Sequence, residues 1–231
     1  RMINLDDIEI IDDDEPLEDP RKRGPHIGKI QIIQETENWA AINKPPYVPS
    51  LPERGKFTAV SVQEWAKSQW PDAILCHRID RETSGVLLIA KNPEAYRHIS
   101  MQFEHRETAK RYHAVVEGMQ DWDGFLVNLP ILPLKDGKVV IDRAKGKHAE
   151  TWFRTLKVFR GYTLVECMPI TGRMHQIRIH LTCLKAPIVC DAMYGGPEIY
   201  LSDLKRNFHL KKDTEELPLM RRVALHAHSL S

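Results

Sequence analysis

The chain has 231 residues, of which 42% are hydrophobic and 28% are charged. This composition is typical of a globular protein with one good-sized domain or two small ones. No apolar run approaches the roughly 18 residues of a membrane-spanning helix, which excludes an integral membrane protein of that kind. The cysteines form no C-x-x-C pair, which indicates reduced thiols in a cytoplasmic protein.

The formal net charge of +1 hides an asymmetry along the chain. The whole chain has 33 basic and 32 acidic residues. Residues 1–19 contain nine of the acidic residues but only one of the basic residues. The remainder holds 32 basic and 23 acidic residues, a formal charge of +9. A basic body favours a polyanion such as RNA as partner, although a generic solvated surface would give the same totals.

The first half of the chain divides into a tail and the start of one domain. Residues 1–28 are acidic, then rich in Pro, Arg and Lys, and predict a tail or linker; residues 29–231 predict the folded domain. A short hairpin is expected over about 30–42, and Ser61 can cap a helix that runs to about Lys67. Val86–Ala90 predicts a buried strand. Asn92, followed by Pro93, predicts a helix to about residue 105.

The second half is rich in strand patterns. Alternating stretches predict strands at 111–117, 149–159, 162–169 and 223–230. Thr171 opens a helical pattern that Pro187 bounds, and residues 202–217 are polar enough for a surface excursion. Many strands with few helices between them predict an α+β fold with a mixed, largely antiparallel sheet.

Residues 77–85, His-Arg-Ile-Asp-Arg-Glu-Thr-Ser-Gly, contain the most informative motif. They place Asp80 between Arg78 and Arg81 in a polar turn that leads into a strand. Neighbouring guanidiniums favour the ionised carboxylate and so predict a lowered pKa, and such a carboxylate can act as a nucleophile or a base. A structural ion pair on a solvated turn is the alternative.

Three strings together resemble the RluA-type pseudouridine synthases. His77–Gly85 is similar to the family signature His-Arg-Leu-Asp-Arg-x-Thr-Ser-Gly, and Lys110–Gly118 to its Lys-x-Tyr-x-Ala-x-Val-x-Gly strand. Thr171–Leu181 is similar to its Thr-Gly-Arg-x-His-Gln-Ile-Arg-x-His-Leu helix. Shorter matches at 41–46, 187–194 and 225–227 follow in the family order, with Cys190 where Gly is usual. Three long strings in order are a specific signal.

The resemblance implies a pseudouridine synthase catalytic domain with a central RNA-binding cleft, and a further strand beyond residue 231. It implies that Asp80 is the catalytic carboxylate and that Arg178 pairs with it. Tyr112 is expected to stack on the target uracil, with its hydroxyl a candidate base for the C5 proton; a core tyrosine is the alternative. Arg78 is expected to fill the gap left by the flipped base or to contact a phosphate.

The expected reaction is the isomerisation of uridine in structured RNA, most simply large-subunit ribosomal RNA. Isomerisation changes no oxidation state, so we expect no cofactor and no metal. His175 and His180 are five residues apart, not the four of a metal-binding helix face. A monomer that binds neither DNA nor membrane is expected. A transfer-RNA target is one alternative, and an RNA-binding or ribosome assembly factor with little catalysis is another; the residues leave open a covalent or a glycal route.

Overall fold

The computed structural model describes residues 29–53, 60–210 and 214–231; the predicted tail, 1–28, lies outside them. The expected hairpin is present as β1 (Gln31–Glu35) and β2 (Trp39–Lys44), which pair antiparallel. On β2, Ala40, Ile42 and Lys44 are buried and alternate with half-exposed residues. One face of β2 therefore packs against the hydrophobic core, as the alternation of β-strand side chains requires.

Two helices begin where their capping residues predict. Helix α1 (Val62–Gln69) starts at Ser61, whose hydroxyl accepts from the Glu64 N–H while the Glu64 carboxylate accepts from the Ser61 N–H. Helix α2 (Pro93–Glu104) starts at Asn92, whose side chain accepts from the Ala95 N–H. Local hydrogen bonds thus fix both starting points.

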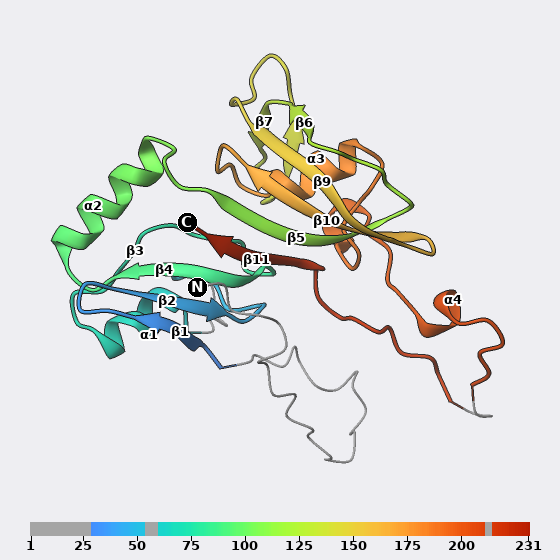
Figure 1. Cartoon of the computed structure of the whole chain (residues 1–231), viewed down its shortest axis with the longest axis horizontal. Helices are drawn as coiled ribbons and strands as arrows, with labels where there is room; N and C mark the ends of the chain where they lie inside the picture. The colour runs from blue at the N-terminus through green and yellow to red at the C-terminus, as the bar shows by residue number, and fades with distance from the viewer. Residues whose placement is uncertain (1–28, 54–59, 211–213) are drawn as a thin grey trace.

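A nine-stranded sheet forms the centre of the fold, in the order β1-β2-β4-β11-β5-β10-β9-β6, with β3 also paired to β4. Its remaining members are β3 (Ile74–Leu75), β4 (Ser84–Ala90), β5 (Lys110–Glu117), β6 (Phe125–Asn128), β9 (Glu150–Phe159), β10 (Tyr162–Pro169) and β11 (Leu225–Leu230). Only the pair β4 and β11 is parallel among the described strands. The expected mixed, largely antiparallel α+β fold is confirmed (Figure 1).

Strand β11 joins the two halves of the sheet. It pairs with β4 through Gly85, which lies opposite Ala227, and with β5 through Tyr112, which also lies opposite Ala227. A Cβ on Gly85 would lie 2.2 Å from the Ala227 carbonyl oxygen, and the φ of Gly85 is +114°. Only glycine fits both conditions. This contact sets the spacing between the strand that follows Asp80 and the strand that carries Tyr112.

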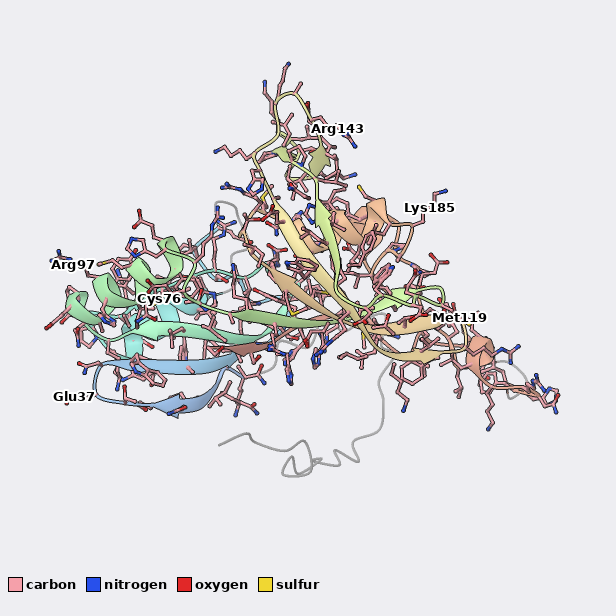
Figure 2. The ribbon with its side chains drawn as sticks, turned by 45° about the horizontal axis from the view of Figure 1, so that its top comes forward. Glu37, Cys76, Arg97, Met119, Arg143 and Lys185 are labelled. Atoms are coloured by element: carbon pink, nitrogen blue, oxygen red, sulfur yellow. The ribbon has the colours of Figure 1, made fainter. Side chains whose placement is uncertain are left out.

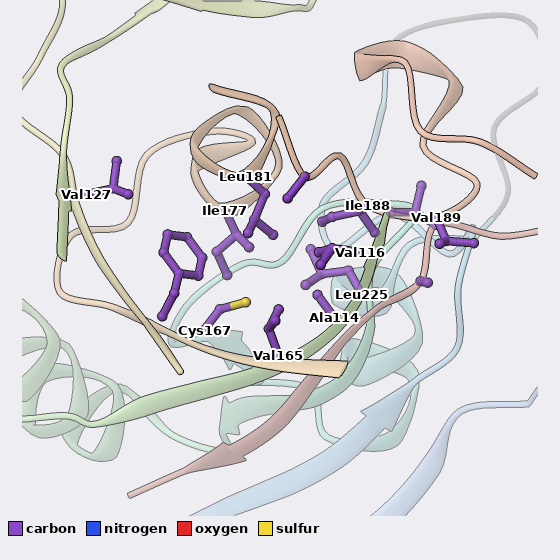
Figure 3. Close-up of a cluster of buried hydrophobic side chains, with 14 residues drawn as sticks. Ala114, Val116, Val127, Val165, Cys167, Ile177, Leu181, Ile188, Val189 and Leu225 are labelled. Atoms are coloured by element: carbon purple, nitrogen blue, oxygen red, sulfur yellow. The ribbon is translucent and has the colours of Figure 1, made fainter. Parts of the chain in front are cut away.

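Helix α3 (Gln176–Cys183) covers the half of the sheet that contains β5, β10 and β9. Ile177 and Leu181 point from it onto Val165, Cys167 and other buried side chains of the strands beneath (Figure 3). The helix begins at Gln176, five residues later than the pattern from Thr171 predicts. The reason is His175, whose φ of 51° places it in the left-handed region and prevents an earlier helical turn.

An arm extends from the sheet beside α3. It contains β7 (Ile131–Pro133) and β8 (Val139–Ile141), and Figure 2 shows Arg143 on it, far from the sheet. A short helix, α4 (Leu201–Leu204), lies in the expected surface excursion. Within the described ranges no helix has the length and apolar character to cross a membrane.

Substituting Gly85→Ala should lower the free energy of unfolding by about 3 kcal/mol or more, because a methyl group would overlap the Ala227 backbone. Urea unfolding measures the loss. Gly161→Ala is the matched control, since its φ is +77° but an added Cβ meets nothing within 4 Å; it should cost about 1 kcal/mol. Equal losses in the two variants would contradict a role for the strand contact.

Candidate active site

The loop of residues 76–83, between β3 and β4, carries Asp80 and is held from both sides. Nε2 of His77 accepts from the Leu88 N–H at 3.1 Å. Burial lowers the pKa of His77 to about 4, so its neutral ring can accept this bond. The Ser50 hydroxyl donates to the Ile79 carbonyl at 2.7 Å and accepts from the Ile79 N–H. The backbone on the N-terminal side of Asp80 is therefore fixed by side chains.

Lys44, at the end of β2, holds the C-terminal side of the same loop. Its side chain is fully buried, and its Nζ donates to the carbonyls of Pro45, Val48 and Arg81 at 2.8–3.0 Å. Burial lowers the pKa of Lys44 to about 7, against the opposing negative charges of Glu82 and Asp80. Three carbonyl acceptors match the three donors of an ammonium group. Lys44 thus ties the loop after β2 to the loop that carries Asp80.

The carboxylate of Asp80 differs from that of a structural aspartate, because it accepts no hydrogen bond from the residues that the structure describes. Its side chain is 20% exposed, and no residue in the described part of the chain donates a hydrogen bond to its carboxylate. Burial raises the pKa of Asp80, and the positive charges of His175 and Arg178 oppose this rise. The expectation of a lowered pKa is therefore wrong in direction, because burial outweighs the flanking arginines.

The two arginines beside Asp80 point to different partners. Arg81 lies 3.0 Å from the Glu53 carboxylate and donates to the Tyr47 carbonyl, so it does not flank Asp80 as an ion pair. Arg78 is exposed at the border between the main cleft and a smaller cavity behind the loop. Of the two, only Arg78 is placed to meet a molecule that enters the cleft.

Arg178, on the first turn of α3, is 2% exposed and lies between three carboxylates. Its Nε and Nη2 donate to both oxygens of Asp191 at 2.7 and 2.8 Å. Its Nη1 lies 3.8 Å from Asp80 and 3.5 Å from Glu82. The expected pair with Asp80 is present as this longer contact, but the bidentate partner is Asp191.

The sequence motifs did not identify Asp191 as a partner. It lies 13 residues after Arg178 and is itself 1% exposed. The only signal was its place in the short match at 187–194, where an aspartate precedes a tyrosine. Cys190, next to it, has a φ of 62°, which explains why glycine is usual there. The turn at Cys190 brings Asp191 back against α3.

Tyr112 stands on β5 beside the loop of Asp80 and packs against both large hydrophobic clusters of the domain. Burial and the charge of Asp80 raise the pKa of its hydroxyl. The phenol is therefore protonated at neutral pH, and its ring is neutral. A protonated hydroxyl is a poor base, so the position favours a role for the ring face.

These residues line one cleft of about 750 Å³. Asp80, Tyr112 and Arg178 lie in its wall, so the structure brings all three expected residues together. The remaining charged lining is almost entirely basic: Arg78, Arg106, Lys110, Lys147 and Arg173, with Glu104 the one other acid. Burial and the charge of Arg106 lower the pKa of Lys110. The walls are thus suited to a polyanion.

The other motif residues have structural partners. His180 is fully buried, and its ring nitrogens lie 3.0 Å from the Thr151 hydroxyl and 3.0 Å from the Leu129 carbonyl oxygen. Both nitrogens are occupied, so His180 orients α3. No group of three metal-ligating side chains occurs in the part of the chain that the structure describes.

Comparison with known proteins identifies the family of this chain. Residues 38–182 match the family model described as RNA pseudouridylate synthase. The ribosomal large subunit pseudouridine synthase C of Vibrio cholerae is 38% identical over 165 residues, which are 71% of this chain and 52% of that protein. The dual-specificity RNA pseudouridine synthase RluA of the same organism is 36% identical over 174 residues, 73% of this chain and 70% of that protein.

Solved structures share the fold. Human RNA pseudouridylate synthase domain containing 1 superposes with a TM-score of 0.67 at 24% identity, covering 90% of this chain and 80% of its own. Human RNA pseudouridylate synthase domain containing 4 gives 0.63 at 27% identity, covering 87% and 83%. This chain spans about half the length of the large-subunit synthases that it matches. The motifs, the matched family model and the identities show that the chain belongs to the RluA-type family of RNA pseudouridine synthases.

Proposed function

We propose that this protein converts uridine to pseudouridine in RNA and that Asp80 is the carboxylate that acts on the target ribose. The observation that carries the proposal is a cleft carboxylate that accepts no hydrogen bond from the described residues, although it lies 3.8 Å from a buried guanidinium. A structural carboxylate uses its lone pairs within the protein, as Asp191 does. The lone pairs of the Asp80 carboxylate are therefore available to contact a substrate.

The reaction breaks the bond between C1′ and N1 of uridine and joins C1′ to C5 of the same uracil. C5 then loses its proton and N1 carries one, so the product is an isomer and nothing is oxidised or reduced. A carboxylate can attack C1′, stabilise positive charge there, or remove the C2′ proton. All three roles require ionised Asp80, which the positive charges of His175 and Arg178 favour against burial.

Tyr112 is proposed to receive the uracil on its ring face. A uridine that reacts at C1′ must leave its helical stack, and an aromatic ring replaces the lost stacking. Because burial and Asp80 keep the hydroxyl protonated, we assign the removal of the C5 proton to another group. Arg78, exposed at the mouth of the cleft, is proposed to contact the RNA next to the flipped base.

Arg178 is proposed to hold the Asp80 carboxylate in position without occupying its lone pairs. Asp191 accepts the hydrogen bonds from Nε and Nη2 of the guanidinium, whereas Nη1 donates to Glu82 and faces Asp80. A direct bidentate bond to Asp80 would occupy the lone pairs needed for reaction. We therefore propose that Asp191 anchors the guanidinium and that Arg178 positions the Asp80 carboxylate electrostatically.

RNA is the proposed substrate, and large-subunit ribosomal RNA is the proposed target. The basic cleft walls and the +9 charge of residues 20–231 support a polyanion. The printed names of the large-subunit synthases support the ribosomal target, and the dual-specificity relative keeps a second RNA class open. No step of the isomerisation calls for a redox, nucleotide or metal cofactor.

Pseudouridine mapping tests the function. Total cellular RNA incubated with the protein should gain pseudouridine at one or a few positions of large-subunit ribosomal RNA, compared with the same RNA incubated without the protein. A gain confined to transfer RNA would replace the ribosomal target with the alternative one. No gain in any RNA would reject the enzyme and favour an RNA-binding or assembly role.

Substituting Asp80→Asn should abolish product formation, with a fall of at least about 10³-fold, while RNA affinity changes by less than about threefold. The substitution removes the reacting charge but leaves the basic walls in place. Tritium release from RNA labelled at uracil C5 measures turnover, and filter binding measures affinity. Asp72→Asn, at an exposed position, is the matched control and should behave as wild type. Equal losses of binding and turnover would indicate a structural Asp80.

Substituting Asp191→Asn should lower the free energy of unfolding by about 3 kcal/mol, since it removes the bidentate ionic partner of the buried Arg178 guanidinium and leaves only the longer contacts with Asp80 and Glu82. The rate should fall as well, because Arg178 is then free to bond Asp80. Urea unfolding and tritium release measure the two effects. Asp121→Asn, on the surface, is the control. Unchanged stability would show that the pair does not hold the site.

Substituting Lys110→Ala should weaken RNA binding about three- to tenfold and reduce the slope of log affinity against log salt by about one. The reason is the loss of one cation from the cleft wall. Lys67→Ala, on the exposed side of α1, is the control and should leave both quantities unchanged. An unchanged slope in Lys110→Ala would place the RNA backbone elsewhere.

A further inference from the structure

The two faces of the central sheet differ in what they carry. Helices α1 and α3 pack on the face that presents Tyr112 and Ala227, through the two large hydrophobic clusters. Because successive side chains of a strand point to opposite faces, His113 on β5 and His226 on β11 face away from the cleft. We call this side of the sheet the back face. Neither of these helices covers it, so its side chains are open to a partner.

A row of polar side chains crosses five strands of the back face. The strand register places its members directly opposite one another, from β9 to β4: Arg154, Glu166, His113, His226 and Ser84. We refer to these five residues as the back-face row. Neighbouring strands lie about 4.8 Å apart, so the row is roughly 19 Å long. The proposed isomerisation uses none of its members.

Glu166 organises two arginines at one end of the row. Its buried carboxylate accepts from Arg154 at 2.9 and 3.1 Å and from Arg111, also on the back face, at 3.3 and 3.4 Å. The two arginine side chains are themselves 48% and 51% exposed. One carboxylate balances one of the two guanidiniums, so this end carries a net positive charge. The fixed guanidiniums keep further N–H donors for an external acceptor.

Arg222 supplies a second cation at the other end of the row. Its Nη1 donates to the Ser84 hydroxyl at 3.0 Å, and that oxygen lies 2.8 Å from Nδ1 of His226. An arginine can only donate, so Ser84 accepts from it and donates its own proton to His226. Burial lowers the pKa of His226 to about 4, and its neutral ring then carries the proton on Nε2. Among the described residues no carboxylate pairs with Arg222.

Flat aromatic side chains accompany the row. His228, the extra residue of a β-bulge in β11, stacks on His113 with ring centroids 3.9 Å apart and planes 16° from parallel. Trp152 lies two residues before Arg154, on the same face of β9, and is 38% exposed. An exposed indole ring beside guanidiniums combines a stacking surface for a base with donors for a phosphate.

We propose that the back-face row, together with Arg111, Arg222 and Trp152, is a second RNA-binding surface that holds RNA outside the active-site cleft. The inference rests on the proposed function, from which it takes RNA as the partner, and extends it to the opposite face of the sheet. Three guanidiniums oppose one carboxylate there, so the charge complements a polyanion. A large RNA with its target in the cleft can reach this face, whereas a single stem-loop seated in the cleft cannot.

Substituting Arg154→Gln tests the charge of this surface. It removes one cation but keeps an amide donor, and Arg111 remains the ionic partner of the buried Glu166. Affinity for a transcript of a whole large-subunit ribosomal RNA domain should fall about three- to tenfold, and the slope of log affinity against log salt should shrink by about one. Affinity for a single stem-loop with uridine in its loop should change by less than about twofold. Fluorescence anisotropy measures both RNAs.

Substituting Trp152→Leu tests the stacking. Leucine keeps an apolar side chain opposite Met168 and Leu126 but removes the aromatic face. Affinity for the long transcript should fall at least about fivefold with the salt slope unchanged, because stacking releases no counterions. Arg97→Gln, at an exposed position of α2 outside the row and the cleft lining, is the control and should change neither affinity nor slope. Urea unfolding checks that each variant is folded.

Three results would overturn the proposal. If Arg154→Gln and Trp152→Leu weaken the long and the short RNA equally, both act through the fold or the cleft. If they weaken neither RNA, the back face does not meet RNA. Analytical ultracentrifugation checks the alternative occupant: a wild-type dimer that both variants dissociate would assign the back face to a second copy of the chain.

These binding measurements require no turnover, so they separate the second surface from the proposed function. If wild type forms no pseudouridine in any RNA, the proposed function fails, and the difference between long and short RNA still decides whether the back face binds RNA. If pseudouridine forms but the variants show no such difference, the proposed function stands and only the second surface is rejected.

Discussion

The geometry of the proposed active site depends on the close contact of Gly85 with Ala227. This contact lets β11 lie between β4 and β5, and Ala227 faces Gly85 on one side and Tyr112 on the other. Asp80 lies five residues before Gly85, in a loop fixed by side-chain hydrogen bonds. The distance between the carboxylate and the aromatic ring is therefore set by the backbone of the sheet. A site on such rigid elements needs little reorganisation when the proposed RNA substrate enters.

Most of the fold could be predicted from the sequence because its signals are local. Ser61 and Asn92 cap their helices because each side chain accepts a hydrogen bond from the backbone N–H three residues later. Apolar alternation gave the long hairpin at 150–169. The start of α3 was missed, since periodicity cannot register that His175 is left-handed. That conformation is imposed by Tyr194, a tertiary contact 19 residues away.

The site was only partly predictable, for the same physical reason. The motifs identified Asp80, Tyr112 and Arg178, which the fold brings to one cleft. They could not show burial, and burial reverses the expected direction of the Asp80 pKa. Nor could they show that Asp191 takes the bidentate bonds of Arg178, because this pairing depends on the turn at Cys190. Charge patterns in a sequence reveal which groups exist, whereas solvation and pairing arise only in the fold.

The most direct test is a crystal structure of the protein bound to RNA whose target is 5-fluorouridine, which has no C5 proton to lose. The account predicts that the fluorouracil ring stacks on Tyr112 and that C1′ of its ribose lies within about 3.5 Å of an Asp80 oxygen, or is bonded to it. It also predicts that Arg178 keeps both bonds to Asp191. A base bound away from Tyr112, or a ribose out of reach of Asp80, would contradict it.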